Sequence, residues 1–335
     1  MATMNDDAIR TAARVCFFAH YHPRAIVADY VLRYLKALRD AGFAVVVLST
    51  AELPHAEQAK LANACARLIM RENVGLDFGG WIEAFRRFMP LKAELLLLAN
   101  DSVYGPVGDL GDFIDRLTAT PADFYGAVES WEGGAHLQSW FLLLRPAAYG
   151  SEAFRAIMAR PIPSDMPKLE IIGRYERGLT HALSGAGLRH YAAYTPHHDS
   201  PVAGALCFNP MQYLWKTLVT RYGVPFIKIE LLRDNPHNVA SVHGWRRLVR
   251  RRAPALVRLI ETDLILRNAR AMPTVRQRFA DSAANHHPLL RPELQPLIVA
   301  EAVLSGVQAR RVIGWLYRAT VRIGTSVRRR LAPMR

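Results

Sequence analysis

The sequence is poor in cysteine and has no long apolar run. Cys16, Cys65 and Cys207 are widely spaced and form no CxxC pair, which argues against a disulfide framework or a structural zinc site and favours a reducing compartment. No stretch reaches the roughly 18 apolar residues that a membrane-spanning helix needs. The first apolar run follows two aspartates and is too short for a signal peptide. We therefore expect a cytoplasmic protein whose contact with a membrane is peripheral, on the inner face of the cell membrane.

The usual phosphate-binding and nucleic-acid-binding motifs are absent as well. There is no GxGxxG sequence and no GxxxxGK sequence, which excludes the common dinucleotide and P-loop phosphate sites. No zinc finger, RNP or KH motif accompanies the arginines, and they lack the interleaved aromatic residues of a single-strand binder. Nucleic acid is therefore not the expected partner.

The positive charge of the chain lies in its C-terminal part. The net charge is +14, and residues 246–335 hold 19 arginines and five acidic residues, so the first 245 residues are neutral. From Val312 to Val327, apolar residues three or four apart form one helical face, with arginines on the other side. Such a helix can lie in the headgroup layer of an anionic membrane. The alternative is a helix that packs on the body of the protein and exposes its arginines to solvent.

The first two thirds of the chain alternate between short β-rich runs and helical patterns. The predicted strands are Arg14–Ala19, Phe43–Leu48, Arg67–Arg71, Glu94–Ala99, Asp123–Val128 and Trp140–Arg145, and the predicted helices include Pro23–Ala41, Glu57–Ala66 and Pro210–Arg221. This alternation predicts an α/β fold with a mostly parallel sheet and helices on both faces. Beyond it the pattern is mainly helical, so we expect an α/β domain over residues 1–240 and a basic helical region over residues 241–335.

The segment Arg71–Trp81 (RENVGLDFGGW) follows a predicted strand and precedes a predicted helix. Its glycines permit backbone conformations and close ligand approach that other residues forbid. The start of the following helix favours an anion such as a diphosphate, and Asp77 could accept hydrogen bonds from the hydroxyls of a ribose or a sugar. The alternative is a glycine-rich turn with a capping aspartate.

Asn100 and Asp101 follow the continuously apolar run 94–99. A buried strand would deliver them to the edge of the sheet where ligands bind in such folds. A carboxylate there can hold Mg²⁺ or Mn²⁺ through oxygen while the cation bridges the two phosphates of a nucleotide sugar. The alternative is structural, because Asn-Asp-Ser followed by Gly-Pro also makes a good turn.

The segment His136–Trp140 (HLQSW) precedes another apolar run. Gln138 and Ser139 are neutral groups of the kind that bind sugar hydroxyls, and Trp140 could stack on a pyranose ring. A buried histidine with satisfied hydrogen bonds and a packing tryptophan are the alternative.

Glu176 falls into the apolar stripe of a helix predicted from about Lys168. A carboxylate on a buried face is costly unless it is paired or functional. Partial burial would raise its pKa toward that of a useful general base, which could deprotonate an acceptor hydroxyl. The alternative is a buried ion pair with an arginine such as Arg174 or Arg177.

Several of these segments, in their order along the chain, resemble the rhamnan synthesis protein F family of bacterial polysaccharide transferases. They lie between Val15 and Pro236 and are FFAHYH, ENVGLDFGGW, LLLLANDSVYGP, DFYGAVES, HLQSWF, YERGLT, NPMQYLW and PFIKIELLRDNP. The first strand–helix–strand unit and the ENVGLDFGG turn are also similar to the nucleotide-binding half of GT-A-type glycosyltransferases. The resemblance implies a GT-A-like, Rossmann-like fold that binds a nucleotide sugar.

The resemblance also implies a reaction and roles for the residues. It implies transfer of rhamnose or a related hexose from a nucleotide-sugar donor to a lipid-linked surface polysaccharide, such as the O-antigen of lipopolysaccharide or a rhamnan. The implied donor-binding residues are Asn73, Gly75, Asp77, Gly79, Asn100 and Asp101, and the implied catalytic and acceptor residues are Glu176, His136, Gln138, Ser139 and Trp140, with Asp101 also serving in catalysis as the metal ligand. One departure is that Asn100-Asp101-Ser102 carries a single carboxylate where GT-A enzymes commonly have two. A lone acid would also fit the second hypothesis, a non-catalytic accessory or scaffold subunit of glycan assembly.

Overall fold

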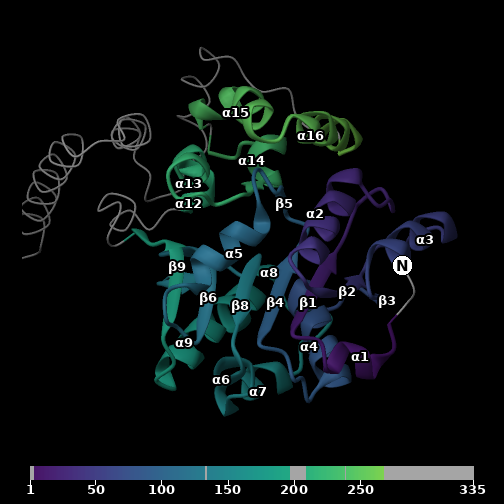
Figure 1. Cartoon of the computed structure of the whole chain (residues 1–335), viewed down its shortest axis with the longest axis vertical. Coiled ribbons are helices and arrows are strands. Elements are labelled where there is room, and N and C mark those ends of the chain that lie inside the picture. The colour runs from purple at the N-terminus through teal and green to yellow at the C-terminus, as the bar shows by residue number, and fades with distance from the viewer. Residues whose placement is uncertain (1–3, 133, 197–208, 238, 268–335) are drawn as a thin grey trace, which may run out of the picture.

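The computed structural model of the chain describes residues 4–132, 134–196, 209–237 and 239–267. Within these ranges it confirms the predicted fold class: a mostly parallel sheet with helices on both faces, followed by a helical C-terminal region (Figure 1). None of the helices in these ranges is both long and apolar enough to cross a membrane. The basic helix predicted between Val312 and Val327 lies outside the described residues.

The main sheet has eight strands in the order β3-β2-β1-β4-β8-β6-β7, with β9 also paired to β6. Strands β1 to β4 are parallel to one another, β8 runs antiparallel between β4 and β6, and β9 is parallel to β6. The strands are β1 (Arg14–His20), β2 (Ala44–Ser49), β3 (Arg67–Met70), β4 (Leu95–Asn100), β6 (Phe124–Ser130), β7 (His136–Leu137), β8 (Phe141–Leu144) and β9 (His190–Tyr194). A second, two-stranded sheet pairs β5 (Val103–Tyr104) with β10 (Ile227–Lys228).

Helices cover both faces of the sheet because its central strands are apolar on both sides. Along β1, Cys16 and Phe18 enter the core on one face, while Val15 and Phe17 enter the core on the other. The core on the first face includes α2 (Asp29–Asp40), α3 (His55–Ala64), α5 (Leu110–Thr118), α12 (Pro210–Tyr213), α13 (Trp215–Thr220) and α14 (Ile229–Arg233). The last described helices, η2 (Ala240–Gly244), α15 (Trp245–Arg252) and α16 (Pro254–Leu266), extend the same core: α16 packs on α2, and α15 packs on α16 and η2. The second face is covered by α1 (Asp6–Arg10), α4 (Leu76–Phe88), α6 (Pro146–Tyr149), α7 (Glu152–Ala159), α8 (Lys168–Ile171), the π-helix η1 (Ile172–Arg177) and α9 (Gly178–Gly185).

The element boundaries differ from the sequence prediction in three places. Helix α2 begins at Asp29, so the stretch after Pro23 is a loop, and the predicted helix 210–221 is two helices, α12 and α13, that meet at Leu214. Helix α4 begins at Leu76, inside the predicted glycine-rich turn. The turn before α4 is therefore shorter than its composition indicates.

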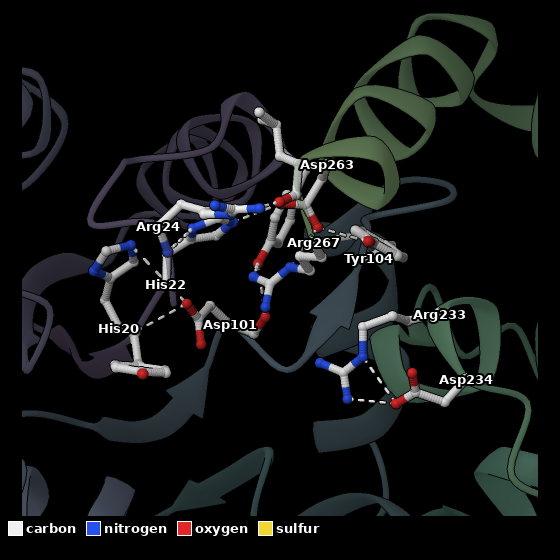
Figure 2. Close-up of polar contacts among 12 residues, drawn as sticks. His20, His22, Arg24, Asp101, Tyr104, Arg233, Asp234, Asp263 and Arg267 are labelled. Carbon is white, nitrogen blue, oxygen red and sulfur yellow. Dashed lines mark hydrogen bonds and ion pairs between the residues drawn. The ribbon is translucent and has the colours of Figure 1, made fainter. Parts of the chain in front are cut away.

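Asp263, in α16, ties the C-terminal helices to the N-terminal strands. Its side chain is 1% exposed and accepts hydrogen bonds from His22 Nε2 at 3.0 Å, Tyr104 OH at 2.6 Å and Arg267 Nε at 2.7 Å (Figure 2). Burial alone would raise the pKa of Asp263, but the hydrogen bond from His22 and the charge of Arg267 hold it below its ordinary value. Arg267 in turn donates to the hydroxyl of Tyr30 at 3.1 Å. The described part of the basic region is thus joined to the α/β body by a buried carboxylate in addition to apolar packing.

Replacing Asp263 with Ala is expected to destabilise the protein by about 3–5 kcal/mol. The reason is that the buried side chains of Arg267 and His22 would lose the carboxylate that accepts their hydrogen bonds. Glu261→Ala is the matched control. Glu261 is on the same helix, and its half-exposed carboxylate pairs with Arg246 at the surface, so its loss should cost no more than about 0.5 kcal/mol. Urea unfolding of both variants measures the difference, and equal stabilities would contradict the role given to Asp263.

Candidate active site

A pocket of about 430 Å³ opens at the carboxyl ends of β1 and β4. These two strands are parallel neighbours, with Ala19 opposite Asn100, and ligands bind beyond the carboxyl ends of such strands. The polar residues that line the pocket are His20, Tyr21, Thr50, Arg71, Asn73, Asp77, Asp101, Ser102, Lys168, Lys228, Glu230, Arg233 and Arg267. Three of the predicted donor residues, Asn73, Asp77 and Asp101, therefore meet at one place.

The two predicted glycines of the turn shape the backbone and do not line the pocket. Gly75 has φ +78° and precedes the first residue of α4. Gly79 lies inside α4, where a Cβ atom would come within 1.9 Å of the carbonyl oxygen of Val74. Only glycine allows this close approach. Of the residues predicted from this turn, Asn73 and Asp77 are thus the ones that line the pocket, on either side of the turn.

Asn100 holds Asp77 in place. Its Nδ2 donates to Asp77 Oδ2 at 2.6 Å, and its Oδ1 accepts hydrogen bonds from the backbone N–H and the hydroxyl of Ser102 at 3.1 and 2.6 Å. Both ends of the amide are therefore engaged, and Asn100 holds the side chain of Asp77 at the pocket. Burial raises the pKa of Asp77, an effect that the hydrogen bond from Asn100 opposes.

Asp101 is the acid that follows β4. Its Oδ2 accepts a hydrogen bond from the backbone N–H of Tyr21 at 3.0 Å, and its carbonyl oxygen accepts one from Tyr30 OH at 3.0 Å. Burial raises the pKa of Asp101 to about 7. Its charge at neutral pH therefore depends on what occupies the pocket.

His20, the last residue of β1, faces the pocket beside Asp101. Its Nδ1 lies 3.0 Å from the hydroxyl of Ser49, and its Nε2 lies 4.0 Å from Asp101 Oδ2. Among the described residues this Nε2 has no hydrogen-bond partner, although the side chain is buried. Burial lowers the pKa of His20 to about 3, so the ring is neutral at physiological pH.

His136, Ser139 and Glu176 form a second cluster next to the pocket. Glu176 accepts hydrogen bonds from Ser139 Oγ at 2.9 Å and from the Ser139 backbone N–H at 3.3 Å, and His136 Nε2 lies 3.6 Å from its Oε1. His136 Nδ1 lies 2.7 Å from the carbonyl oxygen of Gly134. Glu176 belongs to the π-helical turn η1, a conformation that occurs frequently at functional sites. The structure therefore brings the three predicted residues together.

The expected pKa of Glu176 is wrong in direction. Burial alone would raise it, but the hydrogen bond and the charge of His136 hold the pKa of Glu176 below its ordinary value. Of the two arginines named as alternative partners, Arg174 pairs with Glu170 in the structure. Conversely, burial would lower the pKa of His136, and the hydrogen bond to Glu176 raises it. The sequence could not reveal this pair because His136 and Glu176 lie forty residues apart on different elements.

Gln138 and Trp140 belong to the packing around the site. Trp140 is 2% exposed, and its Nε1 donates to Gln138 Oε1 at 2.9 Å. Gln138 Nε2 donates to Asn209 Oδ1 at 2.9 Å. The ring of Trp140 is therefore a core side chain with no face open to a sugar, as the packing alternative has it. The exposed aromatic ring at the pocket is that of Tyr21, which is 48% exposed.

The basic residues of the pocket are the part of the site that sequence reasoning missed. Arg233 and Arg267 come from α14 and from the end of α16, and Lys228 comes from β10. Arg233 and Arg267 line the same pocket as Asp101 (Figure 2). The segment PFIKIELLRDNP was the available signal for two of them, since Lys228 and Arg233 both belong to this segment of the family resemblance.

Comparisons with known proteins find a matching family model and relatives that match part of the chain. The family model described as rhamnan synthesis protein F matches residues 45–278. The chain is 28% identical to the uncharacterized protein y4gN of Sinorhizobium fredii, over 52% of this chain and 47% of that protein. It is 29% identical to virulence protein VirA of Vibrio anguillarum, over 53% of this chain and 66% of that protein. The chain thus spans between about half and two thirds of the length of these relatives.

Two solved structures are also similar. The mannosyltransferase PcManGT of Pyrobaculum calidifontis, in complex with GDP-Man and Mn²⁺, has a TM-score of 0.38 and 12% identity, over 89% of this chain and 87% of that chain. S. aureus TarS in complex with UDP has a TM-score of 0.34 and 14% identity, over 92% of this chain and 91% of that chain.

Replacing Glu176 with Gln is expected to lower the pKa of His136, because the carboxylate is what raises it. The stability that His136 contributes is fully present below its ordinary pKa of 6.5 and is lost as the pH rises through the raised value. The contribution of Glu176 is present above 4.5 and is lost as the pH falls. NMR titration of His136 measures the change. Glu170→Gln is the control, and an unchanged His136 titration in Glu176→Gln would contradict the pairing.

Replacing Asp101 with Asn is expected to raise the melting temperature more at pH 8 than at pH 5. Because the folded-state pKa is raised to about 7, the native protein binds the proton more tightly, and stability falls as the pH rises from about 4 to about 7. Asn removes this penalty and keeps an acceptor for Tyr21. Thermal melts across this range, with the exposed Asp165→Asn as control, measure it. A difference that does not vary with pH would show that Asp101 is ionised throughout.

Proposed function

The chain belongs to the rhamnan synthesis protein F family, and from that membership we propose that it is a glycosyltransferase of surface-polysaccharide assembly. The proposed reaction moves rhamnose or a related hexose from a nucleotide-sugar donor to a lipid-linked acceptor, as in an O-antigen or a rhamnan. The observation that carries the proposal is the pocket at the carboxyl ends of β1 and β4, where the predicted donor residues Asn73, Asp77 and Asp101 meet. A pocket of about 430 Å³ falls within the size range of small-molecule sites.

In this proposal the pocket binds the donor. Asn73 and Asp77 offer oxygen acceptors and an amide to the hydroxyls of a ribose or a sugar, and Asn100 holds Asp77 in the orientation that this requires. The exposed ring of Tyr21 offers a face on which a base or a sugar can stack. The basic residues of the pocket give it the charge that a diphosphate needs.

The predicted divalent cation on Asp101 remains a prediction. Mg²⁺ in phosphate-transfer sites is usually held by one or two carboxylates together with phosphate oxygens. Among the described residues no three His, Cys, Asp or Glu side chains are grouped to hold a metal ion. Asp101 already accepts a hydrogen bond from Tyr21, and Asp77 accepts one from Asn100. The donor set therefore fits a resident metal poorly, and we assign no step of the reaction to one.

Glu176 is the proposed proton acceptor. Because its pKa is held low, Glu176 is ionised at neutral pH, and it lies close enough to Lys228 and Asp77 in the pocket for their charges to act on one another. Ser139 and His136 fix the orientation of its carboxylate. Attack of the acceptor oxygen on the anomeric carbon would pass the hydroxyl proton to Glu176, while His136 positions that carboxylate and compensates its charge.

Membrane attachment is proposed for the basic C-terminal region. In the described part, α15 (WRRLVRRR) buries Trp245, Leu248 and Val249 in the core and exposes its arginines. This basic face supports binding to anionic headgroups, where each arginine near the surface contributes about 1 kcal/mol. A cytoplasmic enzyme held at the inner face of the cell membrane in this way would meet a lipid-linked acceptor.

Glu176→Gln is expected to lower the transfer rate by about 100-fold or more, because general base catalysis contributes roughly 10²–10⁴-fold, while leaving donor affinity unchanged. Thermal-shift screening of the wild type against dTDP-, UDP- and GDP-sugars selects the donor, and a transfer assay with that donor measures the rate. Glu170→Gln, on the neighbouring helical turn, is the control and should keep full activity. Full activity of Glu176→Gln would refute its role, and donor binding without turnover by the wild type would favour an accessory subunit instead.

A further inference from the structure

Lys228 reaches the donor pocket through the small second sheet. Strand β10 pairs antiparallel with β5, and Lys228 lies opposite Val103, just after the turn that carries Asp101 and Ser102. Its Nζ donates to Ser102 Oγ at 3.1 Å and lines the pocket. The pairing of two short strands therefore brings an amine from residue 228 to the carboxyl end of β4.

The ammonium group of Lys228 has hydrogen-bonding capacity to spare. The lysine ion pairs of the described residues are those of Lys36 and Lys60, and the hydroxyl of Ser102 is the one hydrogen-bond acceptor within reach of Lys228 in those ranges. An ammonium has three donors. Its Nζ also lies 5.9 Å from the centre of the Trp140 ring. Two N–H groups remain for a ligand in the pocket.

The carboxylates around Lys228 come from three different elements. Burial lowers the pKa of Lys228, and the charges of Glu176 in η1, Glu230 in α14 and Asp77 in α4 raise it again. Lys168, at the start of α8, lowers it further. Lys228 is therefore a desolvated cation whose charge is offset by carboxylates that do not contact it directly.

The two arginines of the same pocket are already anchored. Arg267 donates to Asp263 and to Tyr30, and Arg233 donates to Asp234. Their positions are thus set before any ligand binds. Together with Lys228 they bring three positive charges from residues 228–267 to a pocket where Asp101 has a pKa raised to about 7. His20 adds a buried ring nitrogen without a partner in the described residues, next to Asp101.

We propose that Lys228 binds the diphosphate of the nucleotide-sugar donor, with Arg233 and Arg267, so that side chains of the protein supply the positive charge at this site. This inference rests on the proposed function. In the transfer step the bond between the anomeric carbon and the diphosphate oxygen breaks, and its electron pair stays on the nucleoside diphosphate. The acceptor oxygen forms the new bond, its proton passes to Glu176, and Lys228 keeps its own proton while donating a hydrogen bond to the departing oxygen.

Nucleotide titration calorimetry on the full-length protein in EDTA tests the proposal. The probes are UDP, GDP and dTDP, each compared with its nucleoside. Lys228→Met is expected to weaken the diphosphate that the wild type binds by about 10- to 100-fold, the size of a lost charge-assisted hydrogen bond, and to leave nucleoside binding unchanged. Lys228→Arg should keep most of the affinity. Lys216→Met, an exposed lysine of α13, should change nothing, and circular dichroism checks that each variant is folded.

The possible results separate the inference from the function on which it rests. Diphosphate affinity of Lys228→Met within twofold of the wild type would overturn the inference and leave the glycosyltransferase proposal intact. The same holds if the wild type binds diphosphates with Mn²⁺ and loses them in EDTA, because a metal would then supply the charge. A wild type that binds none of the three diphosphates in either condition would overturn both proposals. Equal losses for the diphosphate and the nucleoside would show a packing role and also count against the inference.

Discussion

A buried carboxylate cannot stay ionised without hydrogen-bond donors. The donors to Asp263 join the last described helix to the N-terminal strands. Its donors come from the loop after β1, from β5 and from the last turn of α16. Meeting them fixes α16 against the α/β body. The hydrogen bond to Asp263 also sets the position of Arg267, which lines the pocket. The same contacts that hold the C-terminal helices in place therefore complete the candidate active site.

The pocket itself follows from the order of the strands. Parallel neighbours β1 and β4 end at one edge, so His20 and Asp101 meet there although eighty residues separate them. The antiparallel strand β8 lies beside β4, and the segment that holds His136 comes directly before it in the chain. Charge is distributed unevenly across this edge, because Asp77 and Asp101 have raised pKa values while Glu176 has a lowered one. In the proposed function, that difference separates a donor side, which suits hydroxyls and a diphosphate, from an acceptor side that holds an anionic base.

Sequence reasoning was accurate where the signal was local. The apolar runs identified the central strands within a residue or two, and residues just after them, such as Asp101, line the pocket as expected. Sequence reasoning was less accurate for pKa values and side-chain burial, because these depend on residues from distant segments. The direction of the Glu176 pKa shift depends on His136, and the burial of Trp140 depends on side chains such as Phe226 from a distant segment. The glycines at 75 and 79 do not line the pocket: Gly75 supplies a positive φ, and Gly79 permits the close approach of the Val74 carbonyl.

The sequence alone determined the α/β class, the alternating elements, the ligand edge of the sheet and the family resemblance, because each depends on periodicity and on short segments in a fixed order. The tertiary structure alone decided which cations enter the pocket. Lys228, Arg233 and Arg267 are scattered over forty residues, and the first two lie in the part of the chain that has no net charge. An arginine in a sequence does not reveal its partner. Only the pairing of β10 with β5 and the buried contacts of Asp263 direct these charges to one site, since burial obliges each of them to find a partner.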